Sequence, residues 1–170
     1  MKKKLIIFVI CLFFATANHS CRSLGLCEPE KLSFARTNFL GTQLRTRGYY
    51  YGDSIFSEGE YSVKVVLLFR NGIFLDNYPI KLSKFFFDPQ LPIVSSDVLN
   101  NSQDYWGVFK INNQQFFIEH WMTPLDGCPK VVKEEAEILN DSTYVLKRTN
   151  KIYRFRASLV KPDSTNNFIK

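Results

Sequence analysis

The sequence has few of the residues from which metal and catalytic sites are usually built. It contains two histidines, His19 and His120, and four cysteines among 170 residues, and it has no C-x-x-C or H-x-x-x-H spacing. A zinc site requires such ligands, so the sequence does not favour one. A glycine-rich phosphate loop is also absent, which excludes that type of nucleotide site. We expect neither a metal nor another cofactor.

A hydrolytic site cannot be assembled from these residues either, because a nucleophile, a base and an orienting group must lie within reach of one another. His120 stands beside Glu119, but neighbours on a strand point to opposite faces, so Glu119 does not orient the ring. Glu135 and Glu137 share a strand face with Lys133, which is typical of a solvated surface. We expect no catalytic residue, no enzyme activity and a structural role for His120.

Long apolar runs are missing except at residues 5–14, which follow Lys2, Lys3 and Lys4 and precede small residues. These are the three parts of a secretory signal. The run is shorter than the roughly 20 residues of a membrane-spanning helix. We therefore expect residues 1–20 to be a signal peptide and the protein to be exported.

Two alternative processing sites could end this signal. Ala15-Thr16-Ala17 is an A-x-A site for ordinary signal peptidase, whereas Cys21 is placed to be the lipid-modified first residue of a bacterial lipoprotein. The residues before Cys21, Asn18-His19-Ser20, depart from the usual Leu-Ala-Gly type of lipobox. The alternative to a membrane-anchored envelope lipoprotein is a periplasmic or secreted protein cleaved after Ala17.

The cysteine count favours lipidation. Cys11 leaves with the signal, so cleavage after Ala17 leaves an odd number, whereas lipidation of Cys21 leaves Cys27 and Cys128 to pair. A disulfide between these two closes a loop of about 100 residues and stabilises the fold by roughly 4 kcal/mol in the chain-entropy model. Two buried thiols that never meet are the alternative.

The basic character of the chain comes largely from the export signal. Residues 1–20 hold three lysines and no acidic residue, so without them the net charge falls from +6 to +3. A nucleic-acid partner requires a concentrated basic patch, and we expect none. The remaining 150 residues or so suit one domain.

Alternating apolar and polar residues between turn signals predict eight β-strands. They are expected at residues 44–51, 61–70, 73–78, the two arms of 105–122, 132–138, 143–148 and 152–158. Residues 21–43 are then a tether, 44–160 the β domain and 161–170 a C-terminal tail. The loop around residues 81–104 holds Phe85, Phe86 and Phe87, for which ordinary core is the plainest interpretation.

Two hairpins carry most of this prediction. Asn71-Gly72 indicates a type I′ turn with positive φ, after an arm at residues 63–69 that is apolar on both faces. A turn at Asn112 and Asn113 puts Phe109 and Ile111 on one buried face with Phe116 and Ile118. Short links between successive strands favour an all-β, lipocalin-like up-and-down barrel, with a two-sheet β-sandwich as the alternative.

Several segments resemble a family of small, uncharacterised bacterial envelope lipoproteins with a lipocalin-like β-meander. The similar segments are the signal with Cys21, residues 48–51, 69–75, 106–111, 138–143 and 153–155, and Lys161-Pro162-Asp163-Ser164-Thr165-Asn166. The resemblance implies a protein of the bacterial cell envelope, of outer-membrane lipoprotein type. It implies no activity, because the family has no established catalytic residues.

Two functions remain open. In the first, the barrel interior or its open end holds a small apolar or aromatic molecule. The expected lining residues are Trp106, Trp121, Tyr49, Tyr51, Phe85, Phe86 and Phe87. In the second, the interior is filled by side chains and the surface docks another envelope protein. In both, the membrane is a partner through the lipid anchor.

Overall fold

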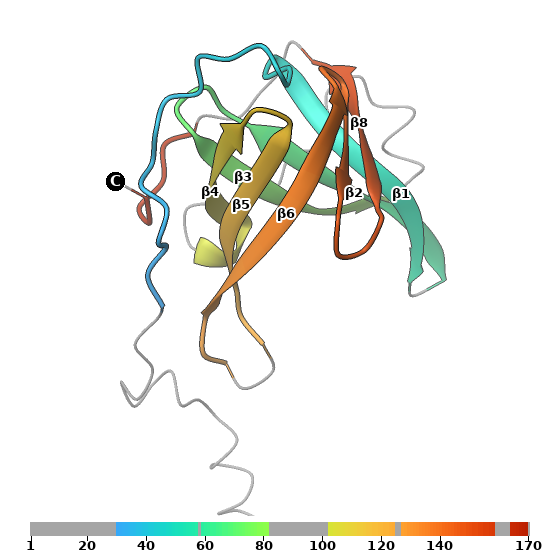
Figure 1. Cartoon of the computed structure of the whole chain (residues 1–170). Coiled ribbons are helices and arrows are strands. Elements are labelled where there is room, and N and C mark those ends of the chain that lie inside the picture. The colour runs from blue at the N-terminus through green and yellow to red at the C-terminus, as the bar shows by residue number, and fades with distance from the viewer. Residues whose placement is uncertain (1–29, 58, 82–101, 125–126, 159–163, 170) are drawn as a thin grey trace, which may run out of the picture. The chain divides into compact units, whose positions relative to one another are not determined.

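The computed structural model describes residues 30–57, 59–81, 102–124, 127–158 and 164–169 (Figure 1). Eight strands form a closed antiparallel barrel in chain order, and the last strand pairs back with the first. They are β1 (Gly48–Ser57), β2 (Glu60–Leu68), β3 (Ile73–Lys81), β4 (Trp106–Asn112), β5 (Gln115–Met122), β6 (Lys130–Asn140), β7 (Thr143–Leu146) and β8 (Ile152–Ala157). A 3-10 turn, η1 (Gln103–Tyr105), precedes β4. The predicted up-and-down barrel is confirmed over the sandwich.

The chain divides into two compact units, of which the larger, residues 31–122 and 131–170, contains nearly all of the barrel. In the smaller unit the N–H of Gly127 donates to the carbonyl of Pro124 at 2.9 Å. Both hydrophobic clusters of the core lie in the larger unit. Within the described residues no helix has the length and hydropathy of a membrane span.

The limits of β1 and β3 depart most from those that the sequence predicted. β1 begins at Gly48, not at residue 44, and runs on to Ser57. β3 continues through Pro79, which we expected to end it. The register of β2 against β3 shifts between the pairs Val65↔Asn77 and Val63↔Ile80. This irregularity gives β3 one extra residue, and proline is tolerated at such a bulge.

The turn between β2 and β3 differs from the type I′ turn that the sequence predicted. Gly72 has φ +81°, as expected, but Asn71 does not share the positive φ. The N–H of Gly72 donates to the carbonyl of Phe69, and the N–H of Phe69 donates to the carbonyl of Ile73. This is a three-residue loop that ends in a left-handed glycine, the other common way to close a hairpin.

An inner cluster of buried side chains fills the barrel, with members from all eight strands. Its aromatic residues are Tyr50, Phe74, Phe109, Phe116, Tyr144 and Tyr153. The central hairpin contributes as predicted: Phe109, Phe116 and Ile118 are buried here, and Ile111 packs against them. Each close aromatic pair adds about 0.5–1.5 kcal/mol beyond its buried area.

An outer cluster lies on the opposite face of β1 to β5. It includes Val63, Val65 and Leu67, so the β2 arm is buried on both faces as predicted. Two segments cover this cluster, residues 31–47, here named the strap, and residues 164–169, here named the tail. The strap contributes Leu32 and Phe34, and the tail contributes Phe168 and Ile169. We expected both segments to be peripheral, whereas part of each completes a core.

The strap runs beside the sheet and then crosses one end of the barrel to reach β1 (Figure 1). There the N–H of Phe39 donates to the carbonyl of Arg70 at 2.7 Å, and the N–H of Arg45 donates to the carbonyl of Asp141 at 3.0 Å. Leu44 is buried in the inner cluster. We name this the closed end, because the strap covers it.

Candidate functional site

Four of the seven aromatic residues that the sequence predicted as ligand contacts lie in the described part of the chain, and these four do not line the barrel interior. Trp106, Trp121 and Tyr49 are buried in the outer cluster, and Tyr51 packs against it. Since side chains alternate along a strand, their inward neighbours are Tyr50, Gly107 and His120 instead. Phe85, Phe86 and Phe87 lie outside the described residues, as do Cys21 and Cys27, the partner expected for Cys128. Ligand binding by these aromatic residues, lipidation and the disulfide all stay predictions.

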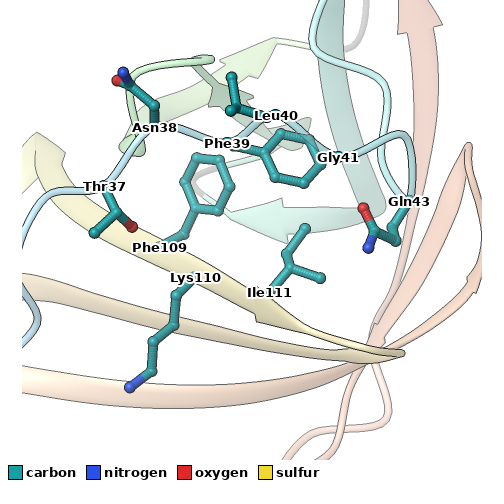
Figure 2. Close-up of a pocket in the computed structure, with 9 residues that line it drawn as sticks. All are labelled: Thr37, Asn38, Phe39, Leu40, Gly41, Gln43, Phe109, Lys110 and Ile111. Atoms are coloured by element: carbon teal, nitrogen blue, oxygen red, sulfur yellow. The ribbon is translucent and has the colours of Figure 1, made fainter.

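A pocket of about 210 Å³ lies under the strap near the closed end (Figure 2). Its walls are residues Thr37, Asn38, Phe39, Leu40, Gly41, Gln43, Phe109, Lys110 and Ile111. Figure 2 shows the side chain of Lys110 directed away from the rings of Phe39 and Phe109. The volume is below the roughly 300–1,000 Å³ of typical ligand sites. This pocket is therefore a weak candidate.

The opposite end of the interior carries charged side chains, and we name it the charged end. Lys64 and Asp76 alternate with Val66 and Phe74, members of the inner cluster, and so point inward. Lys64 Nζ lies 2.7 Å from Asp76 Oδ2, with the side chains 31% and 16% exposed. Burial lowers the pKa of Lys64, but Asp76, Tyr153 and Glu134 together outweigh burial and the pKa is raised overall. Burial raises the pKa of Asp76, and Lys64 opposes this shift. Lys64 is therefore a cation at neutral pH.

His120 and Glu134 complete the charged end. His120 lies two residues after the inward-facing Ile118 on β5, and Glu134 lies two residues before the inward-facing Ala136 on β6, so both point inward. Their side chains are 9% and 15% exposed. His120 Nε2 is 3.9 Å from Glu134 Oε2, and Arg148 Nη2 is 3.9 Å from Glu134 Oε1. Both separations exceed hydrogen-bond length. Gly107 pairs with His120, and a Cβ at residue 107 would lie 2.7 Å from the His120 Cβ, so glycine allows this close approach.

Tyrosine rings connect the charged end to the aromatic interior. Tyr144 stacks on Tyr153 at 5.0 Å between ring centroids, and Tyr50 lies 5.2 Å from Tyr144. Burial raises the pKa of Tyr153 to about 12; Lys64 opposes this shift, and the carboxylates of Asp76 and Glu134 add to it. Burial also raises the pKa of Tyr144. Tyr144 and Tyr153 are therefore neutral at physiological pH, whereas the Tyr50 hydroxyl already donates to the carbonyls of Arg45 and Asp141 at 3.1 Å.

No family model, curated protein or solved structure matches this chain. The site must therefore be judged on its own geometry.

The charged end offers one ammonium, two carboxylates, an imidazole and a phenol, all partly screened from water. Such a set holds polar groups of a ligand by charge and hydrogen bonds. Among the described residues, no three metal-ligating side chains come together. The sequence signal that we missed is the interruption of apolar strands by single charges, namely Lys64 between valines in β2 and Asp76 after Phe74 and Leu75 in β3.

Proposed function

We propose that this chain is an exported, lipid-anchored protein of the bacterial cell envelope whose barrel binds a small molecule at its charged end. One observation carries the binding function: the interior holds an ion pair and a loosely contacted carboxylate where apolar side chains would serve stability as well. Replacing a buried ion pair by apolar residues is often neutral or stabilising. The charges are therefore better explained by a ligand than by folding.

The anchor rests on the signal and on Cys21, with Cys27 and Cys128 paired in the mature protein. We expect the mature chain to begin at Cys21 with a diacylglyceryl group and to partition with membranes. Mass spectrometry of the amino-terminal peptide checks this, with Cys21→Ser as the matched control, which should move to the soluble fraction. An unmodified amino terminus at Asn18 contradicts the anchor.

A paired substitution separates ligand binding from stability. We expect Lys64→Met combined with Asp76→Leu to leave the melting temperature unchanged or raise it, because no charge of the pair is left alone. Asp76→Leu by itself leaves Lys64 buried without its partner, which costs about 3–5 kcal/mol. Native mass spectrometry of protein purified from its own cells should find a small molecule on the wild type and none on the double variant.

A specific observation favours a second function, an interaction module without a ligand. The interior toward the closed end is filled by contacting rings, from Phe39 on Phe109 through Phe116 to Tyr144. A wild-type protein that carries no small molecule, together with a double variant of equal stability, supports this second function. We do not propose an enzyme, because the charged groups lack a nucleophile activated by an adjacent base.

A further inference from the structure

His120 and Glu134 face each other at 3.9 Å, beyond hydrogen-bond distance. The His120 Nδ1 atom lies 3.1 Å from the carbonyl oxygen of Trp121. A carbonyl only accepts, so Nδ1 carries the proton, and in the neutral ring Nε2 is then an acceptor. Across the 3.9 Å to Glu134 Oε2, a lone pair therefore meets a carboxylate. A donor placed beside both atoms would satisfy both at once.

The two carboxylates of the same region are not paired equally closely. Asp76 and Glu134 contribute two carboxylates, and Lys64, held at 2.7 Å by Asp76, contributes the ammonium. Arg148 is 77% exposed and stands 3.9 Å from Glu134, so it forms no hydrogen bond and is screened by water. Glu134, at 15% exposure, therefore has ion-pair partners at 3.9 Å but no cation within hydrogen-bond distance among the described residues. Such a charge is costly unless a cation is supplied.

We propose that the charged end binds an organic amine in its protonated form, with the ammonium donating to Glu134 Oε2 and His120 Nε2. This inference rests on the proposed function and specifies its ligand class. An ammonium supplies both the missing charge and several N–H donors. Tyr153, whose pKa is raised in part by Glu134, and Phe74, whose ring lies 5.7 Å from the imidazole of His120, are aromatic side chains near this contact.

Three probes with the same apolar chain test the class of ligand: n-hexylamine, hexan-1-ol and hexanoate. We measure their dissociation constants by calorimetry at pH 8, where histidine side chains are in general neutral. Hexylammonium should bind at least about ten-fold more tightly than the other two, because only the ammonium brings a charge opposite to the Glu134 carboxylate; hexanol is neutral and hexanoate is repelled. Tighter binding of hexanoate overturns the proposal.

Substitutions on one strand locate the contact. Glu134→Gln should weaken hexylammonium binding about ten- to a hundred-fold and leave hexanol unchanged. Glu135→Gln is the matched control, since Glu135 is the next residue, points away from the interior and pairs with Lys147. It should bind the amine as the wild type does. Circular dichroism and melting curves establish that each variant is folded.

The outcomes separate the two levels of the proposal. Amine binding that survives Glu134→Gln but is lost in the Lys64→Met/Asp76→Leu variant overturns the amine contact and leaves a binding site at the charged end. No binding of any probe, together with wild-type protein free of any small molecule, overturns both.

Discussion

Glu119→Gln should lower the melting temperature by about 4–15 °C, which corresponds to a loss of about 2–4 kcal/mol. Glu119 is fully buried on the outer face of β5 and accepts hydrogen bonds from the N–H groups of Ser33 and Phe34 at 2.6 and 2.7 Å. The Ser33 hydroxyl also donates to it, and Lys133 Nζ lies 2.9 Å away. A glutamine loses the charge and turns an N–H₂ group toward donors.

The stability that Glu119→Gln loses relative to the wild type should depend on pH. Burial raises the pKa of Glu119, but hydrogen bonds from Ser33, Lys133 and Phe34 outweigh burial and lower the pKa overall. A carboxyl with a lowered folded-state pKa stabilises the fold above its unfolded value, about 4.3, and this stabilisation is lost as the pH falls through the folded-state pKa. The difference between wild type and Glu119→Gln should therefore narrow below about pH 4.

Melting curves from pH 3 to 7 measure this difference. Hydrogen exchange adds a local readout, because the amides of Ser33 and Phe34 should exchange faster in the variant. Glu135→Gln is again a suitable control, since its exposed pair with Lys147 is worth less than about 1 kcal/mol. If Glu119→Gln had the same melting temperature as the wild type at pH 7, Glu119 would not hold the strap in place.

Gly72→Val should lower the melting temperature by about 4–20 °C. Two effects add: a side chain at φ +81° costs about 1–2 kcal/mol, and forcing it against its neighbours costs about 1–3 kcal/mol more. The neighbour is the strap, because a Cβ at residue 72 would overlap the backbone carbonyl of Thr37. The strap or the turn must therefore move.

Gly59→Val separates these two effects. Gly59 has nearly the same φ, +80°, but apart from its chain neighbours no atom of the described residues lies within 4 Å of its added Cβ. The Gly59→Val variant should show the effect of backbone strain alone, which is a decrease of a few degrees in the melting temperature. If Gly72→Val and Gly59→Val lowered the melting temperature equally, the contact between Gly72 and the strap would contribute nothing to stability.

The barrel was predictable because its signals are local. Alternation, turn residues and short links specify strands and their neighbours, and the faces of the central hairpin follow from its register. The turn conformation at Asn71 and Gly72 was not predictable, because loops of two and three residues share the same turn residues. The continuation of β3 through Pro79 depends on a bulge against β2, which propensity does not reveal.

The candidate site was not predictable to the same degree. Trp106 and Trp121 were expected around a ligand because aromatic residues often line pockets, but they sit under the strap and tail. Which face of a strand points inward is decided by what covers the other face, and this cover comes from segments far away in the sequence. Lys64, Asp76, His120 and Glu134 lie on four strands, and only barrel closure brings them to one end.

The seam between β1 and β8 joins Gly48 to Ala157, residues near opposite ends of the domain. The pairs formed by strands that are consecutive in the chain can assemble locally, whereas the seam must wait until the whole span between them is present. Long-range pairing of this kind is slow, because loop closure must precede it. Until then β1 and β8 each present an unpaired edge to which other chains can add. The half-closed barrel is thus the aggregation-prone species, and a chain cut before Ile152 keeps that edge open.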